Sequence, residues 1–158
     1  MIILGIDPGT NRIGFGAIKK LGNRWCHLKS GLIEISKDIK KINGLPVLDK
    51  KINELLVDIR PDKVGVEKIF FSKNRKTAIE VAQARGVILN AVLKKKIALI
   101  EMTPSEIKLI AAGHGRATKK AVAKMVSLTI GYPKTDQIDD ITDALAIAIA
   151  ASTKKSYV

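Results

Sequence analysis

The order in which short apolar runs and helix-period segments follow one another constrains the fold of this 158-residue chain most strongly. Apolar runs predict strands at 2–6, 13–19, 25–35, 63–67 and 97–102. The second and third runs are joined by Leu21-Gly22-Asn23, a turn sequence that predicts a hairpin. The predicted order is three strands, a helix, a strand, a helix, a strand and then further helices. This order indicates an α/β fold with a mixed sheet flanked by helices.

Apolar residues at helical spacing predict helices at 49–59, 76–93, 118–130 and 136–151. A further helix is expected to begin at Thr103-Pro104-Ser105-Glu106, because Thr103 fits the N-cap, Pro104 the first helical position and Glu106 the capping box. Gly113-His114-Gly115 is expected to end that helix. Since no repeat or linker interrupts this series, we expect a single domain spanning residues 1–158.

The chain is strongly basic: 28 Lys and Arg residues against 15 Asp and Glu residues give a formal net charge of +13. Such an excess attracts polyanions, and nucleic-acid affinity depends on Lys and Arg displacing condensed counterions. Nucleic acid is therefore the first partner to consider. A lysine-rich surface that merely reflects genome composition is the simpler alternative.

Several sequence features bear on the compartment. Cys26 is the only cysteine, so no intrachain disulfide can form, and a reducing compartment is expected. Residues 1–6 lack the basic flank of a signal peptide and are followed by Asp7. The apolar stretch 144–151 is much shorter than the roughly 20 residues of a membrane span. We therefore expect a cytoplasmic protein with no membrane partner.

The positions of the acids suggest a chemistry. Asp7 and Glu67 end predicted strands, where α/β sheets place ligand sites. Four acids crowd the start of the last predicted helix: Asp136, Asp139, Asp140 and Asp143. Each has an ordinary explanation, because Asp before Pro-Gly forms turns and acids favour helix N-termini. Together, however, they favour a carboxylate site for Mg²⁺ or Mn²⁺, in which two ions about 3.5–4 Å apart hydrolyse a phosphodiester. Spacing alone does not choose between Asp139 and Asp140.

Four segments follow one another along the chain: residues 3–10 (ILGIDPGT), 66–70 (VEKIF), 83–86 (QARG) and 140–148 (DITDALAIA). In these segments, and in order from residue 2 to about 150, the sequence resembles a known family, the RuvC-type Holliday-junction resolvases. The resemblance implies a ribonuclease H-like fold with a five-stranded mixed sheet and a homodimer. It also implies Mg²⁺-dependent, paired nicking of like-polarity strands across four-way DNA junctions in recombination and repair, alongside a possible branch-migration motor.

Matched position by position, the resemblance implies that Asp7, Glu67, Asp140 and Asp143 are the metal ligands, with Mn²⁺ able to replace Mg²⁺. Phe70 matches an aromatic residue that the family inserts among junction bases, where stacking recovers about 1–3 kcal/mol. Phe71 is its neighbour, and one of the two is expected to be a core or dimer contact. Further DNA contacts are expected at Lys73, Asn74, Lys108, Arg116 and Lys119. The predicted helix 76–93 is the candidate for packing against a second copy.

Three alternatives remain open at this stage. A ribonuclease H-like nuclease that processes RNA shares the Asp-x-Gly-x-x-Arg-Ile-Gly start, which residues 7–14 fit. A non-catalytic protein that only binds branched DNA would need no metal. An actin-like ATPase shares the Asp-Pro-Gly sequence, but such proteins need two domains of this kind.

Overall fold

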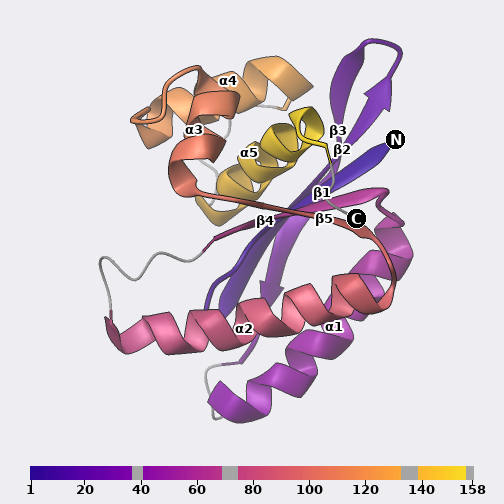
Figure 1. The fold of residues 1–158 in the computed structure, drawn as a ribbon, viewed down its shortest axis with the longest axis vertical. Helices are drawn as coiled ribbons and strands as arrows, with labels where there is room; N and C mark the ends of the chain where they lie inside the picture. Colours follow the sequence, from indigo (N-terminus) through magenta and orange to yellow (C-terminus); the bar gives the residue numbers. More distant parts are fainter. Residues whose placement is uncertain (37–40, 69–74, 133–138, 156–158) are drawn as a thin grey trace.

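A five-stranded mixed sheet forms the centre of the protein (Figure 1). The structure is a computed structural model, and it describes residues 1–36, 41–68, 75–132 and 139–155. The strand order is β3-β2-β1-β4-β5, in which β1, β2 and β3 are antiparallel and β4 and β5 run parallel to β1. The strands are β1 (Ile2–Asp7), β2 (Arg12–Leu21), β3 (Arg24–Glu34), β4 (Lys63–Glu67) and β5 (Ala98–Met102).

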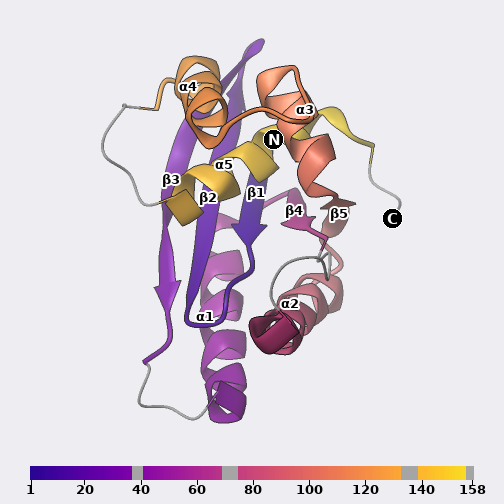
Figure 2. The ribbon, with the colours of Figure 1, turned by 90° about the vertical axis from the view of Figure 1, so that its left-hand side faces the viewer.

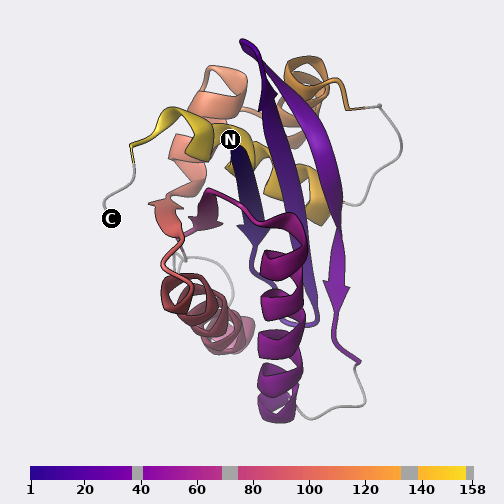
Figure 3. The same ribbon diagram turned by 90° about the vertical axis from the view of Figure 1, so that its right-hand side faces the viewer.

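Helices cover both faces of this sheet. One face carries α1 and α2, and the other carries α3, α4 and α5, as Figures 1 and 2 show. Figure 3 shows α1 along the length of the sheet with α2 beside it. The helices are α1 (Gly44–Ile59), α2 (Arg75–Lys94), α3 (Pro104–Ala112), α4 (Lys119–Ile130) and α5 (Asp139–Thr153), and a short 3-10 helix, Lys41–Asn43, precedes α1. No helix in the described ranges is long and apolar enough to cross a membrane.

Alternation along β1 divides the core into two layers and determines where Asp7 lies. Leu4 and Ile6 are fully buried against α1 and α2, whereas Ile3 is buried in the layer with α5. Because successive side chains of a strand point to opposite faces, Asp7 lies on the α5 face. The strand therefore presents its terminal carboxylate to the side of the sheet that carries the last three helices.

Glycines allow the backbone of α5 to lie directly on the sheet. A Cβ atom at Gly5 would overlap the carbonyl of Ala144, and one at Gly14 would overlap the carbonyl of Asp140. Gly14 is paired with Asp7 across the β1–β2 ladder. The first turn of α5 is consequently held beside the residue that ends β1.

Most of the predicted elements are confirmed. Gly22, with φ of 57°, lies in the predicted hairpin turn. The capping box of α3 is present, because Thr103 Oγ1 accepts from the Glu106 amide (3.2 Å) and Glu106 Oε2 accepts from the Thr103 amide (2.8 Å). Gly113 ends α3 in the left-handed conformation, with φ of 77°.

The predicted starts of two helices need comment: α1 begins earlier than predicted, and the predicted start of α5 lies outside the described residues. Helix α1 begins at Gly44, five positions before the predicted 49. Gly44 and Pro46 resemble helix breakers, but proline is tolerated in a first helical turn because its missing N–H has no helical partner there. The last helix was expected from 136, and the structure describes it from Asp139; residues 136–138 lie outside the described part.

Candidate metal centre

Two of the predicted acids lie next to each other at the ends of neighbouring strands. Asp7 ends β1 and Glu67 ends β4, and these parallel strands are paired up to Ile6 and Val66, one residue earlier in each. Gly65, two residues before Glu67, faces α5, where an added Cβ atom would meet Ile147 at 3.0 Å. By alternation, the Glu67 side chain points to the same face as that of Asp7.

Helix α5 brings two further acids to this point. Asp140 lies over Gly14, which is opposite Asp7 in the ladder. Asp143 follows three residues later, so it lies on the same face of the helix. It lines a groove together with Glu67. The structure thus brings together the four acids that the resemblance selected.

Burial and mutual repulsion raise the pKa values of three carboxyl groups in this cluster. The pKa of Asp7 is raised from 3.8 to about 8, first by burial and then by the charges of Asp143, Glu67 and Asp140. Burial and the charge of Asp143 raise the pKa of Glu67. Burial raises the pKa of Asp143; the charge of Lys119 opposes this rise, and the charges of Asp139 and Asp140 add to it. Like charges held this closely favour protonation unless a cation neutralises them.

Basic side chains supply part of that neutralisation. Arg12 Nη2 lies 3.3 Å from Asp140 Oδ2. Lys119 Nζ donates to Asp139 Oδ2 at 3.2 Å and lies 3.7 Å from Asp143 Oδ2. The sequence analysis included Arg12 only as part of the Asp-x-Gly-x-x-Arg-Ile-Gly start, and it did not predict the ion pair of Arg12 with Asp140. Asp139 is the most exposed of these acids, at 71%.

These ion pairs affect whether the four acids can bind a metal ion together. Within the described residues, no three His, Cys, Asp or Glu side chains lie where they could hold one metal ion together. Asp140 and Asp143 are each engaged by a cation of the chain, as just described. A metal ion that used all four acids would have to share Asp140 and Asp143 with Arg12 and Lys119, or displace these cations, since each carboxylate has two acceptor oxygens.

A groove between β4, α3, α4 and α5 is lined by two of the acids, Glu67 and Asp143. Lys108 of α3 and Lys119, two of the residues predicted to contact DNA, both line it, and the charge of Lys108 lowers the pKa of Glu67 against the effect of burial. Arg116 is exposed between α3 and α4 and is not among the described lining residues. The lining comprises Glu67, Pro104, Ile107, Lys108, Lys119, Val122, Asp143, Ala146 and Ile147. Phe70, Phe71, Lys73 and Asn74 lie outside the described residues.

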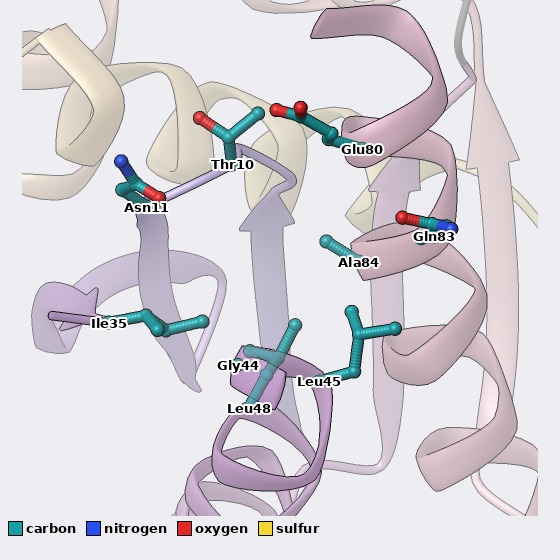
Figure 4. Close-up of a pocket in the computed structure, with 9 residues that line it drawn as sticks. All are labelled: Thr10, Asn11, Ile35, Gly44, Leu45, Leu48, Glu80, Gln83 and Ala84. Carbon is teal, nitrogen blue, oxygen red and sulfur yellow. The ribbon is translucent and has the colours of Figure 1, made fainter. Parts of the chain in front are cut away.

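A second pocket lies where the β1–β2 turn approaches α2 and the start of α1 (Figure 4). In Figure 4, Thr10 and Glu80 lie at one end of it, and Ile35 and Leu48 lie at the other. Among its described lining residues, Glu80 is the only acid. This pocket therefore does not offer the multiple carboxylates that characterise the first site.

The chemistry of the first site fits a hard divalent cation. Its donors are carboxylate oxygens, which Mg²⁺ and Mn²⁺ prefer over the nitrogen and sulfur ligands typical of zinc. Burial and the repulsion between neighbouring acids raise the pKa values of Asp7, Glu67 and Asp143, and a bound cation would relieve that repulsion. The residues present therefore suit a magnesium or manganese site.

A stability measurement in chelator tests this electrostatic description. Because the pKa of Asp7 rises from 3.8 to about 8 on folding, its contribution to stability is complete below the lower value and is lost as pH rises through the higher one. Asp7→Asn stays neutral, so we expect its melting temperature to exceed that of the unsubstituted protein by roughly 2–6 °C at about pH 9. Below about pH 4 the difference should vanish. Equal pH dependence of the two melting curves would contradict the assignment.

Comparisons with known proteins agree with this geometry. The family model "Crossover junction endodeoxyribonuclease RuvC" matches residues 3–151. Relatives of that name from Petrotoga mobilis and Halothermothrix orenii are 42% and 40% identical, and the alignments cover 94% of this chain and 91% and 90% of theirs.

Solved structures show the same similarity. The structure of Thermus thermophilus RuvC with a Holliday-junction substrate superposes with a TM-score of 0.88 at 29% identity, covering 96% of this chain and 93% of that one. The yeast mitochondrial resolvase Ydc2, with a TM-score of 0.69 at 13% identity over 94% and 76% of the two chains, shares the fold. The predicted ribonuclease H-like α/β fold is confirmed, and the chain belongs to the RuvC family of crossover junction endodeoxyribonucleases.

Proposed function

We propose that this chain is a Holliday-junction resolvase: a structure-selective endonuclease that nicks two like-polarity strands of a four-way DNA junction during recombination and repair. The observation that carries the proposal is that Asp7 and Asp140 lie beside Glu67 and Asp143, which line a groove together with Lys108 and Lys119, in a member of this family. An RNA-processing nuclease remains the alternative enzyme, but the family match favours DNA junctions.

We propose that the four carboxylates hold Mg²⁺, with Mn²⁺ as a substitute, and that two ions occupy each site. When bound, such ions activate water and stabilise the leaving oxygen of the phosphodiester. Asp7 and Glu67 fix one side of the site from the sheet, and Asp140 and Asp143 fix the other from α5. The exposure of the Asp139 side chain, 71% against 36% for Asp140, supports Asp140, not Asp139, as the ligand.

Lys108 and Lys119 are proposed to hold the phosphate backbone beside the acids, because both line the groove and both carry positive charge. Lysine–phosphate contacts of this kind release counterions, so junction binding should weaken as salt rises. Roles in DNA binding for Arg116, Phe70, Phe71, Lys73 and Asn74 stay predictions from the resemblance.

A homodimer is proposed on the basis of α2. Ile79 and Leu93 are 66% and 51% exposed, although both are large and apolar. With Ala82, Gly86 and Leu89 they form a stripe with alternating spacings of three and four residues, the pattern by which helices pack on each other. A two-fold dimer would present two identical sites to the two-fold axis of an open junction. A motor partner, a cytoplasmic location and a single nuclease domain over 1–158 also stay predictions.

Incubation with a synthetic immobile four-way junction tests the function. With Mg²⁺ we expect paired nicks at symmetric positions on two strands of like polarity. We expect no nicks in chelator, and none on linear duplexes with the same arm sequences. Junction binding without products would indicate a non-catalytic binder, and faster cleavage of structured RNA would indicate an RNA-processing nuclease.

A further inference from the structure

Arg85 of α2 contacts the backbone of the residue that ends β4. Its Nε donates a hydrogen bond to the Glu67 carbonyl oxygen at 3.1 Å, and its Nη2 forms an ion pair with Glu101 Oε1 on β5. The Arg85 side chain is 19% exposed. Since α2 covers one face of the sheet and the Glu67 side chain points to the other, Arg85 holds the Glu67 peptide from behind the candidate site.

Among the described strands, the sheet supplies no main-chain donor for this carbonyl. The Lys68 amide donates to the Met102 carbonyl on β5 at 2.8 Å. Because the C=O and the N–H of one peptide group point in opposite directions, the Glu67 carbonyl of that peptide faces β1. The β1–β4 pairing, continued from Ile6 and Val66, places residue 8 opposite that oxygen. Residue 8 is Pro8, which has no N–H to donate.

The surroundings of Arg85 hold its guanidinium in this position. Ala84 and Ile88 of α2 are 3% and 0% exposed, so this turn of the helix is anchored in the core. Glu101 lies on the α2 side of β5, because its neighbours Ile100 and Met102 are buried in the layer with α5. An arginine can serve both partners at once, since its planar head carries five donors in a fixed fork.

We propose that Arg85 is a positioning residue for Glu67: it replaces the main-chain donor that Pro8 cannot provide and thereby sets the direction of the Glu67 carboxylate. The inference rests on the proposed function, because it takes Glu67 as a metal ligand. Loss of the Arg85 hydrogen bond would let the last peptide of β4 rotate. Losses of such supporting contacts typically cost about 10- to 100-fold in metal affinity or activity.

The test compares Arg85→Met with Arg85→Lys in two assays. One measures junction nicking, and the other measures Mn²⁺ binding directly by electron paramagnetic resonance. For Arg85→Met we expect kcat to fall about 10- to 100-fold and Mn²⁺ binding to weaken to a similar degree. The KM for the junction should stay within about twofold, because no DNA contact is removed. Arg85→Lys keeps a donor and should recover most of the lost rate.

Lys154→Met is the matched control. This substitution breaks the ion pair between Lys154 and Glu106. The side chains of Lys154 and Glu106 are 28% and 41% exposed, which is close to the 19% and 38% of Arg85 and Glu101. Unchanged kcat and Mn²⁺ affinity in Arg85→Met would overturn the proposal. So would losses of rate and melting temperature that Lys154→Met reproduces, because they would indicate a general role in stability.

Two further results keep the test decisive. If Arg85→Met does not fold, Glu101→Met takes its place: weaker Mn²⁺ binding at an unchanged melting temperature supports the proposal, and unchanged Mn²⁺ binding contradicts it. If the unsubstituted protein binds Mn²⁺ but nicks no junction, the proposed function fails, and Mn²⁺ binding still decides the role of Arg85. If it nicks junctions and Arg85→Met behaves like it, only the inference about Arg85 fails.

Discussion

Asp7→Asn is expected to lower the rate of junction nicking by about a thousandfold or more, because the loss of a charged ligand removes several kcal/mol of transition-state stabilisation. Asp7 lies at the centre of the acid cluster, since Asp143, Glu67 and Asp140 all raise its pKa. Junction affinity should change little, because it depends on the basic residues. Single-turnover nicking and a binding titration in Ca²⁺ or chelator measure the two properties separately.

Asp58→Asn is the control for that variant. Asp58 is 56% exposed and pairs with Lys29 at 2.7 Å, away from the candidate site. It should nick junctions at the rate of the unsubstituted protein. Nicking by Asp7→Asn at more than about a tenth of the normal rate would contradict the role of Asp7 as a metal ligand.

Gly14→Ala is expected to damage both stability and activity. Its Cβ atom would overlap the Asp140 carbonyl and lie 2.6 Å from the Asp140 carbonyl carbon, which are backbone atoms that cannot rotate away. Overpacking of this kind costs about 1–3 kcal/mol of unfolding free energy. Because α5 must shift away from β2, Asp140 should also move from Asp7, and nicking should fall at temperatures where the variant is still folded. Urea unfolding and nicking of the same preparations measure both effects.

Gly115→Ala provides the comparison. An added Cβ atom there would have only ordinary contacts, the nearest at 3.4 Å from the Ser105 carbonyl oxygen. Its unfolding free energy should stay within about 0.5 kcal/mol of the unsubstituted value. If Gly14→Ala matched Gly115→Ala in both stability and nicking, the close approach of α5 to the sheet would not be what positions Asp140.

The sequence predicted the parts of this protein that depend on local patterns. Asp7 and Glu67 were found at strand ends because an apolar run stops at each of them. The capping box at Thr103 and Glu106 was visible because its residues lie three positions apart and interact within one helical turn. The spacing of Asp140 and Asp143 indicated a shared helix face, although it did not exclude Asp139.

What the sequence did not predict depends on contacts between distant segments. The ion pair of Arg12 with Asp140 and the contact of Arg85 with the Glu67 carbonyl arise only when β2, α2, β4 and α5 are assembled. The start of α1 was missed for a different reason: Gly44 and Pro46 are common in loops, and only packing shows that a helix includes them.

The arrangement also explains how a chain of net charge +13 accommodates clustered acids. The long-range positive charge draws in the DNA backbone, whereas the carboxylates act over a few ångströms at one end of the sheet. Lys119 contacts Asp139 and Asp143 and also lines the groove. Displacement of Lys119 from the acids by a metal ion would leave its ammonium group available to a phosphate.

Titration with Mn²⁺, followed by electron paramagnetic resonance, measures most directly whether the four acids form one metal site. We expect saturable binding by the unsubstituted protein and by Asp139→Asn, and a large loss of affinity in each of Asp7→Asn, Glu67→Gln, Asp140→Asn and Asp143→Asn. Binding at the unsubstituted affinity in Asp7→Asn or Glu67→Gln would contradict a shared site.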